Sequence, residues 1–398
     1  MPGQIESCLP EGAKSSAAEL SGSAKHDVLG KSREDLRAAM EEIGEPAYRG
    51  AQLYHALYAE RRLDFASMSN LPAALREGLA QRFRIGMPEV SRRFHSSDGS
   101  VRYLLALAAR GKEGAGESPA RVEAVFMPSA GRQAICISTQ AGCAVECRFC
   151  LTAQLGLVRN LTAGEILAQV LLALEENRES LTPRTNIVLM GQGEPLLNYD
   201  PVVAALRVML DTNGMGLGAR HVTLSTSGIV PGIERLGREK MRPRLAISLN
   251  ASTDDERDAI MPINRKYPLK MLLEACREYP LRPREILTFE YVLLGGFNDS
   301  AEDARRVARL LSGISAKVNL IPWNPGELPY RPPAAESTEE FRQVLNAKGV
   351  PAFVRYSRGQ DVNAACGQLA LSERGSLVPA IASSPSCPSA APSATSSA

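Results

Sequence analysis

Histidine and tryptophan are scarce in this chain, and long apolar segments are missing. Its 398 residues contain four histidines and one tryptophan, so few nitrogen ligands are present for a metal. No run of about 18 apolar residues occurs, which predicts that no segment spans a membrane. The first residues, MPGQIESCLPEGAKSS, lack an apolar core preceded by basic residues and do not resemble a secretory signal. We therefore expect a cytoplasmic protein, in which clustered cysteines bind metal or do chemistry.

The chain also lacks a strong charge bias. Its net charge is +2, with 44% hydrophobic and 23% charged residues, which is ordinary for a globular protein. Composition alone therefore gives no reason to expect a nucleic-acid partner. Residues 1–30 are small and polar, and residues 373–398 are rich in Ser, Ala and Pro, so we expect a flexible N-terminal arm and a disordered tail.

Between the ends, the hydrophobic pattern changes once. Three short helical patterns, the first capped by Ser32 and the third opened near Pro72, predict a small helical accessory domain over residues 31–92. Its sequence shows no RNA-binding signature, and a role in docking RNA is only what the family resemblance described below implies. A turn at Asp98-Gly99 then leads into a strand. From about residue 120, short β-branched runs alternate with helical segments, which predicts an α/β fold with a parallel sheet closed into a barrel or partial barrel. These runs are 121–127, 134–139, 186–191, 221–227, 244–250, 286–294 and 317–324. We assign residues 93–372 to this core.

Several of the predicted strands end in small or polar residues. These ends read GQGEP, STSG, SLN and PWN. Gly, Pro, Ser and Asn favour turns, so each ending taken alone is explained as a turn. In a parallel α/β barrel, however, the carboxyl ends of the strands form one rim, where active sites lie. The four endings together predict a site at that rim.

Four cysteines lie within the stretch CISTQAGCAVECRFC, residues 136–150. Cys143, Cys147 and Cys150 follow the pattern C-x3-C-x2-C. Thiolates are ligands of iron–sulfur clusters and of zinc, and a closed zinc site needs four ligands, usually arranged as two pairs. Three cysteines on one loop fit three corners of a four-iron cluster and leave one iron open. From the spacing alone, an iron–sulfur cluster, a zinc site and separate buried thiols all remain possible.

Long motifs add a resemblance to a known family. The stretches concerned are SSDG, CISTQAGCAVECRFC, TAQLGLVRNLT, GQGEPLLN, VTLSTSGIVP, ISLNA, MPINRKY, LIPWNP and DVNAACGQLA. In this order, over about residues 30–372, they resemble the RlmN/Cfr family of radical S-adenosylmethionine RNA methyltransferases. The resemblance implies a partial (β/α)6 barrel that carries a 4Fe–4S cluster and uses two S-adenosylmethionine molecules per turnover.

The resemblance also implies roles for single residues. Cys143, Cys147 and Cys150 match the cluster ligands, and the remaining iron chelates the amino acid part of S-adenosylmethionine. Further positions match contacts to this cofactor: Gly193, Glu194, Ser225, Ser248, Leu249, Asn250 and Asn324. A carboxylate at Glu194 suits the methionine ammonium, because a charge-assisted hydrogen bond is stronger than a neutral one.

Three more residues match the catalytic group of the family. Cys366 matches a methyl carrier, Cys136 the thiol that resolves the protein–RNA adduct through a disulfide with Cys366, and Glu123 a proton acceptor. Without the resemblance, Cys366 would be a small buried hydrophobe, Cys136 a core position of an apolar strand, and Glu123 a solvent-facing residue. Cys8 and Cys387 match no motif, and Cys276 fits a helix core.

The implied activity is formation of 2-methyladenosine in 23S rRNA (position 2503 in standard rRNA numbering) and in tRNAs (position 37). A flavodoxin or ferredoxin is expected as electron donor, and a monomer as the active form. The basic segments KMRPR, NRKY, RPR and RYSR provide positive charge for phosphates, although each also suits a solvated surface. The chain departs from many relatives at Gln192 (methionine), Asn250 (histidine) and Leu151 (serine). Two alternatives stay open: methylation of carbon 8 of the same adenine, as in Cfr, and a non-catalytic metal protein that binds RNA.

Overall fold

The computed structural model describes residues 25–108 and 120–371, and one ten-stranded sheet organises this part of the chain. The strand order is β14-β13-β12-β11-β10-β9-β6-β5-β4-β3. The bounds are β3 Glu89–His95, β4 Val101–Ala106, β5 Arg121–Ser129, β6 Arg132–Cys136, β9 Thr185–Leu189, β10 Val222–Thr226, β11 Arg244–Ser248, β12 Leu287–Leu293, β13 Ala316–Pro322 and β14 Ala352–Val354.

The sheet has a parallel part and an antiparallel extension. Strands β6, β9, β10, β11, β12, β13 and β14 pair in parallel, whereas β3, β4 and β5 form an antiparallel meander that joins β6. The turn predicted at Asp98-Gly99 connects β3 to β4, and Gly99 takes the positive φ of 81° that such a turn favours. Within the described residues no pairing joins β14 to β3, so the barrel is open.

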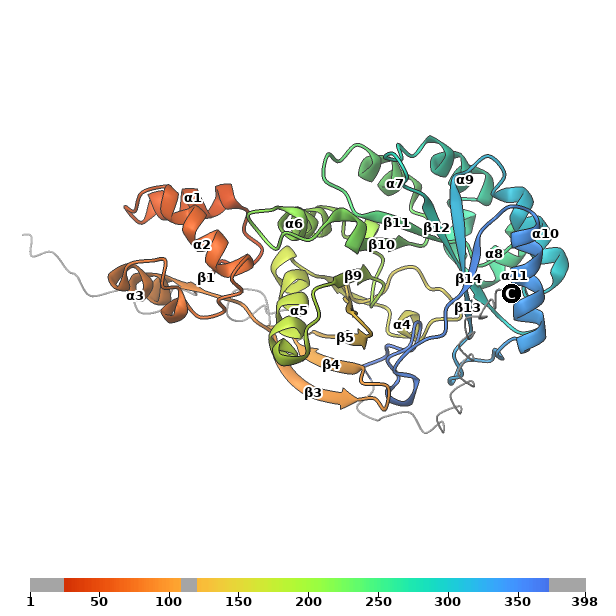
Figure 1. Ribbon diagram of the computed structural model, residues 1–398, viewed down its shortest axis with the longest axis horizontal. Helices are drawn as coiled ribbons and strands as arrows, with labels where there is room; N and C mark the ends of the chain where they lie inside the picture. The colour runs from red at the N-terminus through yellow and green to blue at the C-terminus, as the bar shows by residue number, and fades with distance from the viewer. Residues whose placement is uncertain (1–24, 109–119, 372–398) are drawn as a thin grey trace, which may run out of the picture.

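Helices connect the parallel strands and cover the outer face of the sheet (Figure 1). Their bounds are α5 Ala163–Glu176, α6 Tyr199–Leu210, α7 Val230–Gly237, α8 Asp254–Ile260, α9 Leu269–Glu278, α10 Ala301–Leu310 and α11 Ala335–Ala347. A capping box opens α5, because the Thr162 hydroxyl accepts from the Glu165 N–H and the Glu165 carboxylate accepts from the Thr162 N–H.

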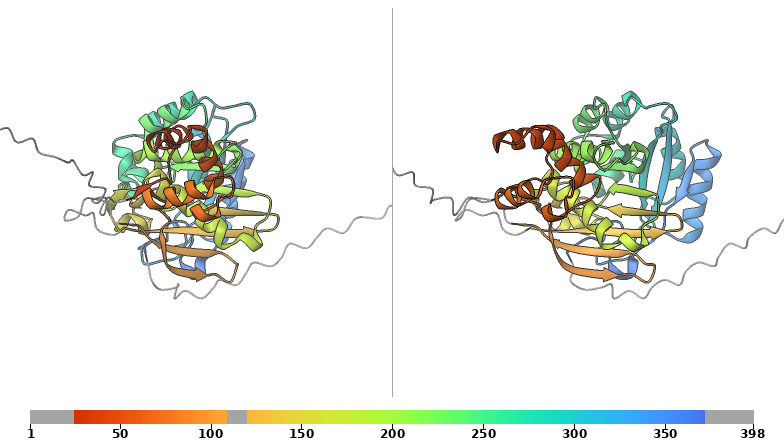
Figure 2. Two further views of the ribbon diagram at one scale, coloured as in Figure 1. Left: turned by 90° about the vertical axis from the view of Figure 1, so that its left-hand side faces the viewer. Right: turned by 60° about the vertical axis from the view of Figure 1, so that its left-hand side comes forward.

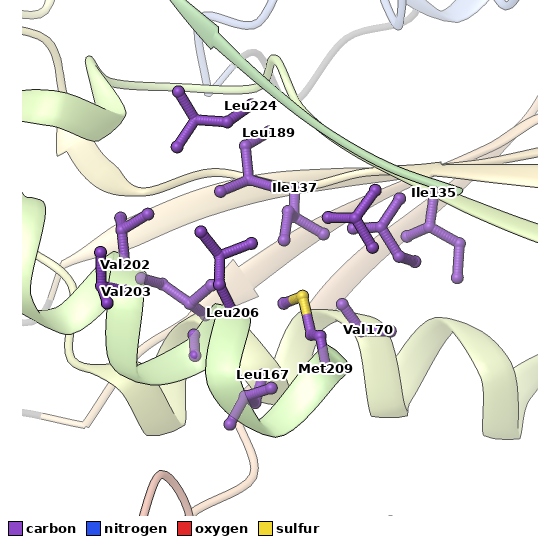
Figure 3. Close-up of a cluster of buried hydrophobic side chains, with 14 of the residues drawn as sticks. Ile135, Ile137, Leu167, Val170, Leu189, Val202, Val203, Leu206, Met209 and Leu224 are labelled. Atoms are coloured by element: carbon purple, nitrogen blue, oxygen red, sulfur yellow. The ribbon is translucent and has the colours of Figure 1, made fainter. Parts of the chain in front are cut away.

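The main core lies between the sheet and these helices. Figure 3 shows side chains of β6, β9 and β10 meeting those of α5 and α6, among them Ile135, Leu189, Leu206 and Met209. Alternate residues of each strand point into this core, and the intervening residues point to the concave face of the open barrel. Most residues predicted for the site share the concave face.

A small helical region lies at one end of the molecule, as two further views also show (Figure 2). It contains α1 (Arg33–Glu42), α2 (Tyr48–Tyr58) and α3 (Ala73–Arg82), closed by the short parallel pair β1 (His26–Asp27) and β2 (Phe83–Arg84). Ser32 caps α1 as predicted, and Phe83 follows α3 as the first residue of β2. The Tyr54 hydroxyl donates to Asp211 at 3.0 Å and ties this region to the end of α6.

The structure confirms the α/β fold with a partial barrel and an N-terminal helical region. Seven parallel strands are present where six were expected, because the short β14 adds to the edge. The domain boundaries stay predictions. Residues 26–29, counted with the N-terminal arm, contain β1 and the buried Val28, while residues 1–24 and 372–398, with Cys8 and Cys387, lie outside the described part. In that part, no helix is long and apolar enough to cross a membrane.

Candidate active site

A cavity opens at the carboxyl ends of the parallel strands, on the predicted rim. It holds about 1000 Å³ of empty space, including the part that opens to solvent. Most residues predicted for the site line it: Cys143, Cys147, Cys150, Gly193, Glu194, Ser225, Ser248, Asn250, Asn324 and Cys366. Leu249, Glu123 and Cys136 do not. Leu249 points into the main core between sheet and helices, because it alternates with Ser248 and Asn250.

The three clustered cysteines occupy one loop, held at its start by a small antiparallel pair. Strands β7 (Gln140–Gly142) and β8 (Leu157–Asn160) form this pair, and the Cys143 N–H donates to the Gly156 carbonyl at 2.9 Å. A Cβ at Gly142, whose φ is 76°, would lie 1.7 Å from that carbonyl, so only glycine fits. The three thiols therefore line one cavity.

The donor set of this loop, three thiols, is of the kind that iron–sulfur clusters take. In the described part of the chain, no group of three or more Cys, His, Asp or Glu side chains lies close enough to hold one metal ion. Burial raises the pKa of Cys143 to about 12, and the neighbouring Glu194 and Cys150 add to this. Bound iron would supply the positive charge that stabilises such thiolates.

Glu194 lies beside this loop and is almost fully buried. Its Oε2 accepts hydrogen bonds from the Ser227 N–H at 2.7 Å and from the Ser227 hydroxyl at 2.8 Å, and its Oε1 accepts from the Leu196 N–H at 3.0 Å. Burial raises the pKa of Glu194, and these hydrogen bonds oppose that rise. Gly193 before it has a φ of 97°, and a Cβ there would lie 2.5 Å from the side chain of Gln140. The carboxylate thus has a fixed direction in the cavity.

Arg257, which no sequence motif singled out, holds the neighbouring strand ends together. This fully buried guanidinium on α8 donates to the carbonyls of Ser227 (2.7 Å), Leu249 (3.0 Å) and Ser248 (3.0 Å). It also donates to Asn264 in the MPINRKY motif, at 3.0 Å. Burial lowers the pKa of Arg257 to about 10, and among the neighbouring groups the Cys147 thiol opposes this lowering most strongly.

The segment that carries Cys366, residues 355–371, crosses the gap between the two edges of the sheet; we call it the strap. Near β13, Asn324 Nδ2 donates to the Ser357 hydroxyl at 2.9 Å and to the Cys366 carbonyl at 3.1 Å. The cluster loop adds two contacts, from the Leu151 N–H to the Gly367 carbonyl at 2.8 Å and from Thr152 to Leu369 at 2.7 Å. The departure at Leu151 leaves this backbone contact unaffected. Cys366 itself is exposed to the cavity.

The strap continues to the hairpin between β3 and β4. Asp361 accepts from the Ser96 hydroxyl at 2.5 Å and from the Ser97 N–H at 2.9 Å. In return, Asp98 Oδ2 accepts from the Gly359 N–H at 3.0 Å and from Arg358 Nε at 3.2 Å. The SSDG turn therefore anchors the strap. Arg358 of the RYSR segment is engaged here, so its predicted role towards phosphates is not supported.

Glu123 lies on β5 beneath the strap, fully buried, so the solvent-facing interpretation is wrong. Its carboxylate forms an ion pair with the equally buried Arg102 of β4. Its Oε2 also accepts from Gln192 Nε2 at 3.3 Å and from the Leu371 N–H at 3.0 Å. Burial raises the pKa of Glu123, and the Arg102 charge opposes that rise. The departure at Gln192 thus places an amide against Glu123.

Cys136 ends β6 on the concave face, packed against Val362, Ala364 and Leu369 of the strap. All six described cysteines are free, so no Cys136–Cys366 disulfide is formed in this structure. Burial raises the pKa of Cys136, and the nearby Cys366 thiol adds to this. Cys276 lies buried in α9, as predicted.

Glu290 of β12 is a cavity residue that the sequence did not reveal. Its neighbours in the run ILTFEYVLL are apolar, and only its position in the strand places it on the concave face. Asn319 Nδ2 donates to its Oε1 at 2.9 Å. Burial raises the pKa of Glu290, whereas Asn319, Arg355 and Lys317 oppose this rise.

Two family models match the chain. One, described as the radical SAM superfamily, matches residues 137–311, and the other, described as the ribosomal RNA large subunit methyltransferase N-terminal domain, matches residues 26–85. With its open parallel barrel and three-cysteine cavity, the protein is a radical S-adenosylmethionine enzyme.

Comparison with similar proteins shows to which family of radical S-adenosylmethionine enzymes the chain belongs. The probable dual-specificity RNA methyltransferase RlmN of Koribacter versatilis (strain Ellin345) is 48% identical over 84% of this chain and 99% of its own. The dual-specificity RNA methyltransferase RlmN of Anaeromyxobacter dehalogenans (strain 2CP-C) is 47% identical over 86% and 94%. A crystal structure of a radical SAM methyltransferase from Sphaerobacter thermophilus has a TM-score of 0.81 and 41% identity, covering 87% of this chain and all of that one. The chain belongs to the RlmN family of S-adenosylmethionine-dependent RNA methyltransferases.

Proposed function

We propose that this protein transfers a methyl group from S-adenosylmethionine to carbon 2 of an adenine in 23S rRNA and in tRNAs. One observation carries the proposal: the cavity brings Cys366 into the same space as the three cysteines of the cluster loop and Glu194. A thiol that merely packed in the core would have no reason to face this cavity. The names of the relatives, dual-specificity RNA methyltransferases, support RNA as the substrate class.

In this proposal Cys143, Cys147 and Cys150 hold a 4Fe–4S cluster. When bound, the cluster supplies the electron that cleaves S-adenosylmethionine and so gives access to radical chemistry. Glu194 accepts hydrogen bonds from the ammonium group of the cofactor. Other residues of the rim contact the rest of the cofactor: Gly193, Ser225, Ser248, Leu249, Asn250 and Asn324. Leu249 contributes through its backbone, since its side chain is in the core.

Three residues act on the methyl group and the base. The Cys366 thiolate first accepts a methyl group by nucleophilic attack, so that one S-adenosylmethionine is spent on this transfer and a second on activating the methyl carbon. Glu123 accepts the proton from carbon 2 of the adenine. The Cys136 thiolate attacks the sulfur of Cys366, so that a disulfide forms while the bond from that sulfur to the transferred carbon breaks, and the RNA leaves with this carbon, which takes up a proton to become the methyl group. Both residues lie beneath the strap that carries Cys366: Glu123 accepts from the Leu371 N–H, and Cys136 packs against Val362, Ala364 and Leu369.

We further propose that the protein acts in the cytoplasm as a monomer, with a flavodoxin or ferredoxin as electron donor. The target adenines are those at position 2503 of 23S rRNA and position 37 of tRNAs.

Nucleoside mass spectrometry tests the proposal. The protein is reconstituted anaerobically with iron and sulfide and incubated with S-adenosylmethionine, a reductant, and unmodified tRNA or an rRNA fragment. We expect 2-methyladenosine. Formation of 8-methyladenosine would instead identify the carbon-8 activity, and RNA binding with no methylated adenine would indicate a non-catalytic protein.

A further inference from the structure

Five basic residues lie along the sheet, from its amino ends towards the cavity. Arg184 precedes β9, Arg220 precedes β10 within the short helix η4 (Ala219–His221), and Arg244 begins β11. Lys317 lies near the start of β13, and Arg355 follows β14. We call these five residues the basic strip. The arginines are exposed and the lysine is half-buried.

Strand register places the middle of the strip on the concave face. Arg244 pairs with Thr223, two residues before Ser225, and Lys317 pairs with Thr288, two residues before Glu290. Because side chains alternate with period two, Arg244 and Lys317 share the face of Ser225 and Glu290, which line the cavity. Arg244 lies four positions before Ser248 of the cavity, about 13 Å along the strand at roughly 3.3 Å per residue.

The protein neutralises the charges of the strip only in part, through the Glu290 carboxylate near Lys317 and Arg355. No ion pair involves any of its five members within the described residues. Burial lowers the pKa of His221, and Arg220, Arg244 and Arg184 lower it further. Burial likewise lowers the pKa of Lys317. The charges of Arg355 and Arg244 lower this pKa further, and the Glu290 carboxylate raises it. Like charges held together in this way repel one another, so an anionic partner would stabilise them.

We propose that the basic strip binds the phosphates of RNA nucleotides that flank the base held in the cavity. This inference rests on the proposed function, which brings an adenine into the cavity. A phosphodiester chain offers repeated negative charges to a row of cations. Phe353, two residues before Arg355, is 53% exposed and pairs in register with Asn319 on the concave face. Its ring offers a stacking platform for an unpaired base, as proteins that bind single-stranded nucleic acid use.

Binding of an unmodified tRNA transcript at several salt concentrations tests the strip. The variant R220Q/R244Q removes two of its charges, and K270Q/K348Q removes two exposed charges from α9 and the end of α11 as a matched control. We expect the strip variant to bind about tenfold more weakly, and the slope of log K against log salt to fall by about 1.4, since each single-strand phosphate contact contributes about 0.7. The control should bind as wild type does. Because charge carries the contact, R220K/R244K should also retain affinity.

Equal affinities and equal salt slopes for the strip variant and the control would overturn this inference. Its failure is distinguishable from failure of the proposed function. If the wild-type protein binds tRNA through the strip and forms no methylated adenine, the inference about the strip is confirmed and the proposed function is wrong. If the wild-type protein forms 2-methyladenosine and the strip variant binds as tightly as the control, only the inference about the strip is wrong.

Discussion

Asp361 and Ser96 lie 265 positions apart in the chain, and the Ser96 hydroxyl donates a hydrogen bond to the Asp361 carboxylate at 2.5 Å. This contact fastens the strap to the β3–β4 hairpin. The same segment holds Cys366 over the cavity and contacts Glu123 through the Leu371 N–H. The antiparallel extension therefore supports both the thiol and the carboxylate to which we assign catalytic roles.

Cysteine substitutions test the two thiol roles. We expect C366A to abolish methyl transfer, because no other thiol in the described part of the chain combines exposure to the cavity with a place outside the cluster loop. C136A should retain the first methyl transfer and accumulate a covalent protein–RNA adduct, visible as a shifted band on a denaturing gel. C276A, which changes a buried thiol of α9, serves as control. If C136A gave normal turnover, Cys136 would not be the resolving thiol.

Loosening the strap should show in hydrogen exchange. Burial opposes ionisation of Asp361, but hydrogen bonds from Ser96 and Ser97 outweigh it and lower its pKa. The folded-state pKa is thus below the unfolded value, so the contribution of Asp361 is present above about pH 4 and is lost as the pH falls further. At pH 7 we expect D361N to accelerate exchange over residues 355–371 by up to about tenfold.

Asp255, an exposed carboxylate on α8, provides the matched control for this measurement. D255N should leave exchange in the strap unchanged. Unaltered strap exchange in D361N would mean that its other contacts hold the strap without Asp361.

The departure at Gln192 leads to a stability prediction. Gln192 is fully buried, and its Oε1 has no hydrogen-bond partner among the described residues. A buried acceptor without a partner costs roughly 1–3 kcal/mol, and methionine has a similar volume. Q192M should therefore raise the free energy of unfolding by about 1 kcal/mol, after loss of the hydrogen bond to Glu123 at 3.3 Å is subtracted. Urea unfolding measures the change, and a decrease would show that the Glu123 contact matters more.

Glu290 should make stability depend on pH. Because burial raises its folded-state pKa, the native state binds this proton more tightly than the unfolded state does. The resulting stability is complete below about pH 4 and is lost as the pH rises through the folded-state pKa. E290Q removes the cost of burying an ionised carboxylate and keeps an acceptor for Asn319. The melting temperature of E290Q should therefore exceed that of wild type by about 2 °C or more at pH 7.5, with little difference near pH 4.

The exposed Glu340 of α11 gives the comparison variant E340Q, which should melt as wild type does at both pH values. A lower melting temperature of E290Q at pH 7.5 would contradict the assignment, since it would mean that Lys317 and Arg355 stabilise the ionised carboxylate beyond its burial cost.

Much of the fold was accessible from sequence because its signals are local. The alternation of β-branched runs with capped helices predicted all parallel strands except β14, which has three residues and too little pattern to recognise. The cavity cysteines followed from spacing and resemblance. Arg257 and Glu290 were missed because each contact that matters comes from elsewhere in the chain: Ser227 and Ser248 for Arg257, and Asn319 for Glu290. The Arg102–Glu123 pair likewise depends on the register of β4 and β5.

The unpaired edges of the barrel have one more consequence. Where β14 and β3 fail to meet, side-chain contacts and a few loop hydrogen bonds take the place of a backbone ladder. Such contacts break one at a time, whereas a ladder separates cooperatively. Displacing this short stretch of chain would therefore cost only these few contacts and would leave the ladder of every strand intact.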